Sequence, residues 1–192
     1  MPCRLAGTRY LAMRITGGTL ARRPIEAPKG DRTRPTADRV REALFSALQS
    51  RIDLGGARVL DLFAGSGALG LEAVSRGATH ATLVERHGPT LALARRNAQS
   101  LGVLDRVATV RADALVHLGR LAGEFDLILA DPPYALAELP TLPSAARPHL
   151  ASGGLFVLEH DARHDFAEAD GLVWTRAYGR TVLSVFEGGR EE

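Results

Sequence analysis

This chain contains, in order, an apolar strand, a glycine-rich turn, a helix and a second apolar strand, and that order strongly restricts its fold. The run Arg58–Leu62 predicts the first strand, and Gly65, Gly67 and Gly70 follow it with the spacing G-x-G-x-x-G. Glu85 ends the second strand, 20 residues after Gly65. Glycines let the backbone approach a ligand closely, and an acid at this distance suits ribose hydroxyls. The pattern predicts an α/β sheet with a nucleotide-binding edge.

The remaining periodicity extends this unit into a doubly wound, Rossmann-like sheet of seven strands. Short apolar runs alternate with amphipathic segments, which is typical of parallel strands covered by helices on both faces. The last two strands are close in sequence, so we expect an antiparallel hairpin at the end of a mostly parallel sheet. Gly17 and Gly18 predict the turn of a further small hairpin over residues 13–26. Predicted strands cover 58–62, 81–85, 107–111, 125–130, 154–159, 172–178 and 181–186, and predicted helices cover 36–50 (capped by Thr36), 66–76, 89–101, 114–121 and 135–150.

The predicted strand Phe125–Ala130 ends in Asp131, Pro132, Pro133 and Tyr134, which gives one strand edge an unusual chemistry. Open α/β sheets bind their ligands at the carboxyl ends of the strands. The prolines fix the backbone torsion φ and have no N–H group, so we expect backbone carbonyls to face outward from an extended turn. A carboxylate, carbonyl acceptors and an aromatic face together suit the exocyclic amine of a nucleobase.

Two ligands fit the glycine turn, a nicotinamide dinucleotide and S-adenosylmethionine. Asp61 lies at the tip of the first strand, four residues before Gly65. A carboxylate at this place repels a pyrophosphate but attracts a methionyl ammonium group. The Asp-Pro-Pro-Tyr segment has no evident role in hydride transfer. The sequence therefore favours S-adenosylmethionine as the cofactor.

These motifs together resemble the bacterial 16S ribosomal RNA guanine-N2 methyltransferase family, whose members modify guanine 966. The resemblance spans roughly residues 13 to 187, as a single domain would. The run that begins at Arg34 is much more specific than the glycine turn, which many methyltransferases share. The resembling segments are Met13–Ile15 with Gly17 and Gly18, Arg34–Phe45, Asp61–Gly70 and Asp131–Tyr134.

The glycine turn and the resemblance together define an expected cofactor pocket. Backbone around Gly65 and Gly67 is expected to line the methionine moiety, because absent side chains permit close approach. The resemblance implies that Asp113 meets the adenine amino group; the alternative is that Asp113 caps a helix that begins at Ala114. The predicted cofactor-binding residues are Asp61, Phe63, Ala64, Gly65, Ser66, Gly67, Glu85, Arg86, Asp113 and Ala114.

The reaction that the resemblance implies is methyl transfer from a sulfonium to the exocyclic N2 of a guanine in 16S rRNA. The N2 lone pair is delocalised into the ring, so N2 is a weak nucleophile. Hydrogen bonds from N2–H to Asp131 and to the Pro132 carbonyl would favour a pyramidal nitrogen and stabilise its developing positive charge. Tyr134 is expected to stack on the base, which must be swung out of its RNA. The predicted catalytic residues are Asp131, Pro132, Pro133 and Tyr134.

Charge is unevenly distributed along the chain, which points to a polyanionic partner. Residues 1–51 carry 11 basic and 4 acidic side chains, whereas residues 52–192 carry 13 basic and 18 acidic ones. We expect a disordered extension at 1–12, a basic hairpin and loop at 13–35 that bind RNA, and a methyltransferase domain at 36–192. The expected RNA contacts are Arg14, Arg22, Arg23, Arg34 and Arg39, with Arg32 and Arg41 as further candidates.

Composition argues against several other kinds of protein. Cys3 is the only cysteine, which excludes an internal disulfide and argues against a covalent cysteine adduct. The sequence has no apolar run long enough to cross a membrane. His160 and His164 have no third ligand nearby in sequence, so we predict no metal site.

The combined expectation is a cytoplasmic monomer that acts on 16S rRNA, within an assembling 30S particle. Three alternatives remain open. A DNA adenine-N6 methyltransferase shares the Asp-Pro-Pro-Tyr motif, a nicotinamide-dependent dehydrogenase shares the glycine turn, and a non-catalytic RNA-binding ribosome assembly factor could keep the whole fold.

Overall fold

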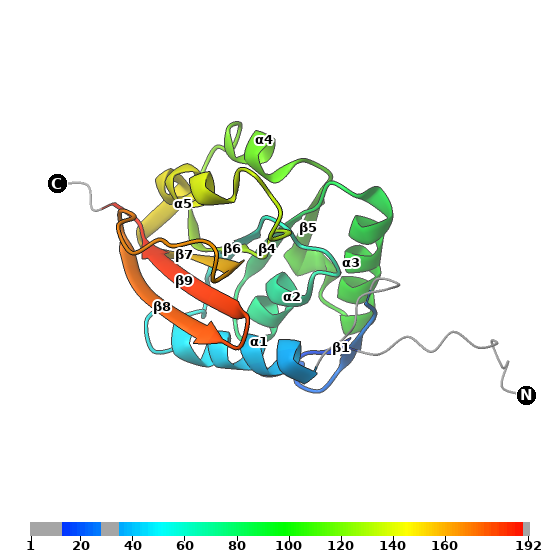
Figure 1. The fold of residues 1–192 in the computed structure, drawn as a ribbon. Coiled ribbons are helices and arrows are strands. Elements are labelled where there is room, and N and C mark those ends of the chain that lie inside the picture. The colour runs from blue at the N-terminus through cyan, green and yellow to red at the C-terminus, as the bar shows by residue number, and fades with distance from the viewer. Residues whose placement is uncertain (1–12, 28–34, 190–192) are drawn as a thin grey trace, which may run out of the picture.

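The computed structural model describes residues 13–27 and 35–189, which form a seven-stranded sheet between helices and a small two-stranded sheet beside it (Figure 1). The predictions for residues 1–12, Arg32 and Arg34 lie outside the described residues. Across the large sheet the strand order is β5-β4-β3-β6-β7-β9-β8. Its strands are β3 (Arg58–Asp61), β4 (His80–Val84), β5 (Val107–Val110), β6 (Phe125–Ala130), β7 (Leu150–Asp161), β8 (Leu172–Tyr178) and β9 (Thr181–Glu187).

The sheet is doubly wound and mostly parallel, as the sequence predicts. Strands β3 to β7 pair in parallel, and β9 inserts antiparallel between β7 and β8. The chain moves from β3 outward to β4 and β5, then returns to place β6 on the other side of β3. This reversal is the topological switch point, where open α/β sheets place their ligands.

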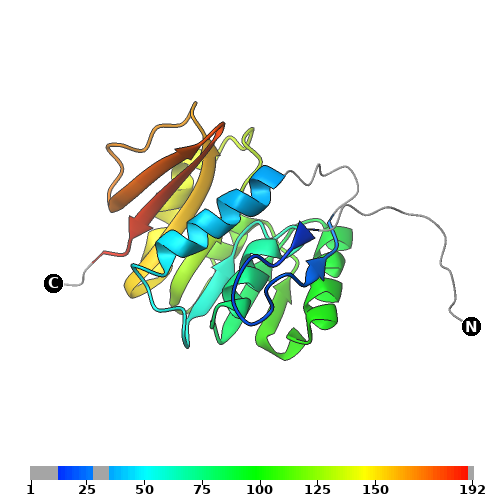
Figure 2. The ribbon, with the colours of Figure 1, turned by 90° about the horizontal axis from the view of Figure 1, so that it is seen from below.

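Helices cover both faces of the sheet, and Figure 2 shows α1 crossing the face that also carries α2 and α3. That face is covered by α1 (Pro35–Leu48), α2 (Ala68–Ser75) and α3 (Gly88–Leu101), with the 3-10 turn η1 (Leu104–Arg106) after α3. The opposite face carries α4 (Ala114–Leu118) and α5 (Leu142–Ala146), which is flanked by the 3-10 turns η2 (Leu139–Thr141) and η3 (Arg147–His149).

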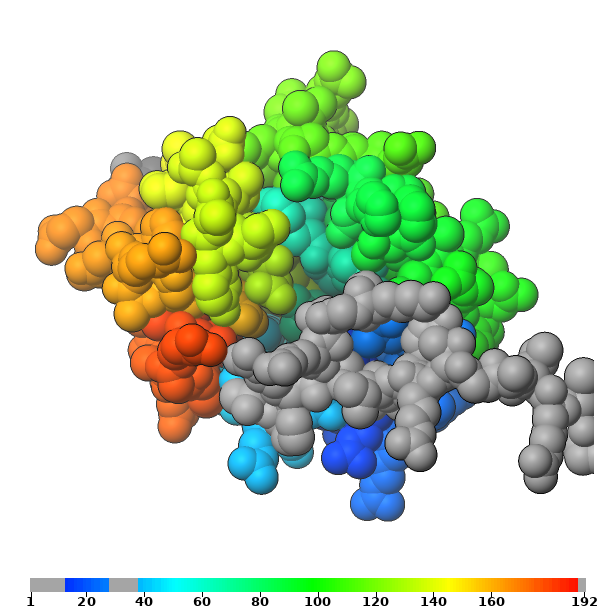
Figure 3. Space-filling view, turned by 45° about the vertical axis from the view of Figure 1, so that its right-hand side comes forward, coloured from blue at the N-terminus to red at the C-terminus, as the bar shows by residue number. Residues whose placement is uncertain are grey.

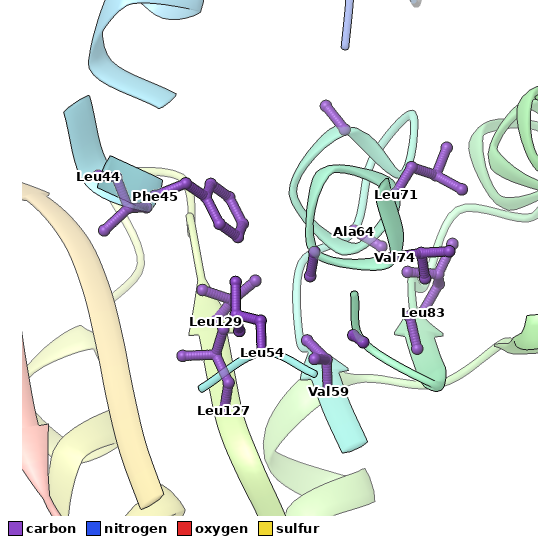
Figure 4. Close-up of a cluster of buried hydrophobic side chains, with 14 of the residues drawn as sticks. Leu44, Phe45, Leu54, Val59, Ala64, Leu71, Val74, Leu83, Leu127 and Leu129 are labelled. Atoms are coloured by element: carbon purple, nitrogen blue, oxygen red, sulfur yellow. The ribbon is translucent and has the colours of Figure 1, made fainter. Parts of the chain in front are cut away.

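Two apolar cores result from the alternation of side chains along the strands. On β6, Leu127 and Leu129 pack under α1 and α2, whereas Ile128 and Ala130 pack under α4 and α5. Successive strand residues point to opposite faces, so a strand covered on both sides must be apolar throughout. Figure 4 shows the first core, where Phe45 of α1 lies above Leu129 and Leu127.

Two predicted segments differ from the structure. The helix predicted over 135–150 is instead the short series η2, α5 and η3, because Pro140, Pro143 and Pro148 each start a new turn and lack an N–H donor. Helix α1 begins at Pro35, so Thr36 lies within the helix and not ahead of it.

The amino-terminal hairpin exists, but its predicted turn at Gly17 and Gly18 is wrong. Strand β1 (Met13–Arg14) pairs antiparallel with β2 (Pro24–Ile25), and residues 15–23 connect them as a long loop. The two glycines lie against α2, where a Cβ on Gly18 would overlap the Ser75 carbonyl. They are therefore needed for close packing between loop and helix, and not for a tight turn.

A buried carboxylate fastens this loop to the body. Glu72 of α2 is fully buried and accepts hydrogen bonds from Thr16 N at 2.8 Å, Thr16 Oγ1 at 2.7 Å and Gly17 N at 2.8 Å. Its negative charge is balanced by Arg76 Nε at 2.8 Å and Arg41 Nε at 3.4 Å. Because every acceptor oxygen is used, the buried charge is compensated and the loop is held in one place.

A second polar link joins the hairpin to the glycine turn. Asn97 of α3 is buried, and its Oδ1 accepts from Glu26 N at 2.8 Å. Its Nδ2 donates to Glu26 O at 2.9 Å and to Ser66 O at 2.9 Å. One amide thus connects the exit of the hairpin with the loop that follows β3.

Candidate active site

The carboxyl ends of β3, β4, β5 and β6 surround a cavity of about 440 Å³ at the switch point. Figure 3 shows this face, with the cyan residues of the glycine turn recessed between the yellow-green segment after β6 and green segments after β4 and β5. The cavity brings together residues that are far apart in sequence. Its lining residues include Phe63, Gly65, Glu85, Arg86, Asp113, Ala114, Asp131, Pro132 and Pro133.

The glycine turn has the backbone that a close ligand contact requires. Gly65 has φ of 54° and Gly67 has φ of 82°, in the left-handed region that favours glycine. A Cβ at Gly65 would meet only the Phe63 carbonyl oxygen at 3.9 Å, so the space beside Gly65 is open. Gly67 and Gly70 differ, because a Cβ there would press on Leu83 of β4. Gly65 therefore faces the cavity, and the other two permit helix–sheet packing.

Asp61 is a buried carboxylate at the tip of β3. Its Oδ2 accepts from Gly70 N at 3.0 Å, whereas its buried Oδ1 has no hydrogen-bond partner among the described residues. Burial raises the pKa of Asp61 to about 7, against the opposing effect of the Gly70 and Phe63 N–H groups. An unpaired buried acceptor of this kind is costly, and a ligand ammonium group would satisfy it.

Glu85 and Asp113 close the other side of the cavity. The Glu85 carboxylate accepts from Gly65 N at 3.2 Å and from His87 N at 2.8 Å, which fixes it beside the glycine turn. Asp113 Oδ1 accepts from Leu115 N at 3.0 Å and Val116 N at 3.2 Å, so Asp113 does cap α4. The cap uses one oxygen, and the exposed residue still lines the cavity. The two interpretations of Asp113 are therefore compatible.

The segment after β6 lies directly across from Asp61. Asp61 is in register with Leu129, so Asp131 follows two residues beyond that level at the same edge of the sheet. Asp131 and Pro133 are exposed and Pro132 is buried, and all three line the cavity. Tyr134 is half-buried and turns its hydroxyl toward the sheet, where it donates to Glu159 Oε1 at 3.0 Å.

The predicted RNA-contacting arginines divide into two groups. Arg14, Arg22 and Arg39 are exposed, and Arg14 pairs only loosely with Asp38 at 3.6 Å. Arg23 is also exposed, but its guanidinium donates to Leu101 O at 2.8 Å and to Ser100 O at 2.5 Å, at the end of α3. Arg23 therefore fastens the hairpin to the body.

The prediction that Arg41 contacts RNA is wrong. Only 4% of this side chain is exposed, and its guanidinium lies between Asp38, at 2.9 Å, and Glu72, at 3.4 Å. Arg41 stands three, four and seven residues before Leu44, Phe45 and Leu48, so it shares their buried face of α1. Its charge is used inside the protein to balance Glu72.

Sequence reasoning missed three polar residues: Glu72, which holds the amino-terminal loop, and Glu159 and Thr181, which contact the Tyr134 hydroxyl. Glu72 is the one acid in the otherwise apolar α2, which is a signal for a buried ion pair. Glu159 follows the apolar run of β7 just as Glu85 follows β4, so the same strand-end rule would have found it. Thr181 carries no comparable signal, because its place depends on how β9 pairs with β7.

Among residues 13–27 and 35–189, no group of three or more potential metal ligands occurs. No helix in the same part of the chain is long and apolar enough to cross a membrane. A larger hollow, of about 920 Å³, opens at the opposite edge of the sheet beside Glu124, Arg147 and Leu150, and its lining includes none of the predicted site residues.

Comparison with proteins of known sequence agrees with this geometry. The Bacillus subtilis protein YlbH, named provisionally as an rRNA methyltransferase, is 36% identical over 183 residues, which are 91% of this chain and 98% of that protein. Ribosomal RNA small subunit methyltransferase D of Escherichia coli is 39% identical over 124 residues, which are 64% of this chain and 60% of that enzyme.

Solved structures have the same fold. The Escherichia coli protein yhhF, assigned provisionally as a methyltransferase, has a TM-score of 0.80 at 30% identity, over 93% of this chain and 99% of that one. A Thermus thermophilus 16S rRNA N2 G1207 methyltransferase, solved with AdoMet and guanosine, has a TM-score of 0.70 at 21% identity. The match covers 94% of this chain and 50% of that one. Residues 13–187 match the family described as "Conserved hypothetical protein 95". The chain belongs to this family, its fold is that of S-adenosylmethionine-dependent methyltransferases, and the relatives it resembles are named for methylation of ribosomal RNA.

Proposed function

We propose that this protein transfers a methyl group from S-adenosylmethionine to the exocyclic N2 of one guanine in 16S rRNA. The observation that carries the proposal is a single cavity lined both by the glycine turn with Glu85 and by Asp131, Pro132 and Pro133. The first set is suited to a nucleoside cofactor, and the second set to an exocyclic amine. A relative named ribosomal RNA small subunit methyltransferase D supplies the substrate class.

The residues that line the cavity, and Asp61 at the tip of β3, fit S-adenosylmethionine on three counts. The buried Oδ1 of Asp61 lacks a partner and would accept from the methionyl ammonium. Open space beside Gly65 admits the methionine moiety next to the backbone. Glu85, already held by two N–H groups, would accept from the ribose hydroxyls, and Asp113 borders the place expected for the adenine. The cofactor, when bound, supplies an electrophilic methyl group on a sulfonium.

On the nucleobase side the protein's work is to position N2 and stabilise charge on it. A hydrogen bond from N2–H to the Asp131 carboxylate, and another to the Pro132 carbonyl, would orient the N2 lone pair toward the methyl group. Both acceptors favour the positive charge that develops on N2 during attack. Most of the rate enhancement then comes from holding two partners in line. The proton leaves N2 after transfer, to Asp131 or to water.

The RNA is expected to dock beside the amino-terminal hairpin, at Arg14, Arg22 and Arg39, which are exposed in the structure. Arg23 and Arg34 complete the set predicted from the sequence. A guanine inside a folded RNA must be unstacked to reach the cavity. We propose that the substrate is a partly assembled 30S particle in the cytoplasm, and that the protein acts as a monomer without a metal ion.

The experiment that tests this function is methyl transfer from tritiated S-adenosylmethionine to 30S subunits purified from cells that lack the protein. Nucleoside analysis then identifies the methylated product, and the naked 16S rRNA is assayed in parallel. Supporting results are a single N2-methylguanosine in the 30S reaction and its absence when Asp131→Ala replaces the wild type.

Two other outcomes would overturn the proposal. Formation of N6-methyladenine in a parallel reaction with DNA, without incorporation into rRNA, would place the protein among the DNA adenine methyltransferases. Tight binding to the 30S particle without methylation of either substrate would favour a non-catalytic assembly factor.

A further inference from the structure

We propose that Glu159, together with Thr181, is a positioning residue that fixes the ring of Tyr134 against the target base. This inference rests on the proposed function and extends it. The Asp-Pro-Pro-Tyr motif follows β6, and the inference adds residues of β7 and β9 to the same site. Glu159 does not touch the reacting atoms in this proposal. It acts through the hydroxyl of Tyr134.

The three side chains meet at one corner of the sheet. Tyr134 OH donates to Glu159 Oε1 at 3.0 Å and lies 3.2 Å from Thr181 Oγ1. Thr181 Oγ1 also points to Glu159 Oε1, at 3.5 Å. Each hydroxyl therefore has the same carboxylate oxygen within reach, and the phenol is held from two directions.

Strand pairing explains why these residues meet. Ala130 is in register with Leu158, so Asp131 and Glu159 stand at the same level on neighbouring strands. Glu159 in turn pairs with Leu183 of β9, and Thr181 lies two residues earlier on the same side of that strand. The antiparallel insertion of β9 is thus what brings a hydroxyl to this edge.

The environment keeps the Tyr134 hydroxyl protonated, so that it can donate to Glu159. Burial raises the pKa of Glu159, while the hydrogen bonds from Tyr134 and Thr181 oppose that rise. Burial also raises the pKa of the Tyr134 phenol to about 12, and the charges of Glu159 and Asp131 act in the same direction. Tyr134 therefore keeps its proton at neutral pH and remains a donor to Glu159.

An anchor matters because Tyr134 lies in an irregular segment between β6 and η2. Backbone pairing within a strand does not orient a side chain there, so the ring depends on its hydroxyl for a fixed angle. A base stacked on a fixed ring presents N2 at one angle to Asp131. A base stacked on a mobile ring would reach that angle only part of the time, which lowers kcat.

The test compares Tyr134→Phe, Glu159→Ala, the double variant and Glu159→Gln in methyl transfer to 30S subunits. We expect kcat to fall on the order of tenfold in each single variant, with the KM for S-adenosylmethionine unchanged. The double variant is expected to be no slower than either single one, because both substitutions break the same bond. Glu159→Gln keeps an acceptor and should restore most of kcat.

A spectroscopic readout makes the result independent of activity. With ¹³Cζ-labelled tyrosine, Glu159→Ala should shift the Tyr134 resonance at neutral pH and leave that of Tyr178, whose hydroxyl is buried without a partner among the described residues, in place. Glu138→Ala, which removes an exposed acid close to Tyr134 in sequence, is the matched control and should change neither the resonance nor kcat. Thermal melting checks that every variant is folded.

The outcomes separate the two claims. A wild-type protein without methyltransferase activity would overturn the proposed function and with it the assignment of Glu159. An active wild type with an unchanged kcat in Glu159→Ala, or with additive losses in the double variant, would overturn only the assignment of Glu159. An unshifted Tyr134 resonance in Glu159→Ala would do the same.

Discussion

The two halves of the cavity are built in different ways. The cofactor half, at the ends of β3, β4 and β5, relies on backbone: Gly65 leaves space, and its N–H is held by Glu85 at 3.2 Å. The nucleobase half, beyond the end of β6, relies on side chains: Tyr134 of the segment after β6 meets Glu159 of β7 and Thr181 of β9. A turn formed by backbone can be predicted from a short sequence motif. Contacts between side chains of different strands depend on the order of the strands in the sheet.

The difference also predicts how substitutions in each half affect folding and binding. Side chains of the nucleobase half can be shortened without disturbing the core, because Asp131 is exposed and Tyr134 is half-buried. Gly67 and Gly70 of the cofactor half are packed against Leu83, so substitutions at these two positions change folding and binding together. The following experiments test that contrast, starting with the largest expected effect.

Asp131→Ala is expected to lower kcat for rRNA methylation on the order of a thousandfold, because it removes the carboxylate that stabilises charge on N2. Binding of S-adenosylmethionine, measured by calorimetry, should stay within about twofold of the wild type, since the glycine turn is untouched. A large loss of cofactor affinity in this variant would show that the two halves are not separable.

Gly70→Ala, unlike Asp131→Ala, is expected to lower both the stability of the protein and its affinity for the cofactor. The new Cβ would overlap Leu83 Cδ2, and the helix shift would disturb the Gly70 N–H bond to Asp61. We expect a loss of about 1–3 kcal/mol in the free energy of unfolding by urea, together with weaker cofactor binding. Gly119→Ala is the matched control, because its Cβ would make only an ordinary contact with Leu115 O at 3.6 Å. Equal stability of the two variants would contradict this account.

Asp61 gives the cofactor half a pH dependence near neutrality. Its pKa rises from 3.8 to about 7 on folding, mainly through burial, with the Glu85 charge in the same direction. The stabilisation by its proton is complete below the unfolded value and is lost as pH rises through about 7. Asp61→Asn should therefore flatten the pH dependence of unfolding in this window.

Cofactor affinity should follow the opposite trend, because the ionised Asp61 binds an ammonium group better. We expect the Kd for S-adenosylmethionine to fall between about pH 6 and about pH 8 in the wild type, and to change much less in Asp61→Asn. Calorimetry at the two pH values measures this. A wild type and variant with the same pH response would exclude Asp61 as the group responsible.

Arg22→Ala and Arg39→Ala are expected to give the smallest effects, because each removes one exposed positive charge outside the cavity. Each should weaken binding to 30S particles by severalfold and lower the slope of log K against log salt by about 1, with kcat at saturating substrate unchanged. Arg120→Ala, an exposed arginine beyond α4, serves as the control. Identical salt slopes for all three variants would place the RNA elsewhere.

Much of the fold was accessible from the sequence because the relevant signals are local. Strand β6 was predicted at its observed bounds, since an apolar run ending in Asp-Pro-Pro has no competing interpretation. The helix predicted at 135–150 breaks up at Pro140, Pro143 and Pro148, whose effect on the backbone outweighs the apolar periodicity of the segment. Each of these prolines lacks the backbone N–H group that a continuous helix needs.

The parts that escaped prediction depend on contacts between distant segments. Arg41 has the spacing of a buried residue, yet a buried arginine is plausible only when its partner is known, and Glu72 belongs to another helix. The role of Gly17 and Gly18 likewise depends on Ser75, which lies more than fifty residues away. The placement of Thr181 beside Tyr134 follows from strand order alone.

Asn97 has a consequence for how this protein can vary. Its single buried amide serves Glu26 at the exit of the hairpin and Ser66 in the cofactor loop. A change at this position therefore alters two regions at once, the hairpin proposed to dock RNA and the loop that follows β3. A chimera that carries the hairpin of a relative would need a matching residue on α3. The hairpin and α3 would therefore have to be exchanged together.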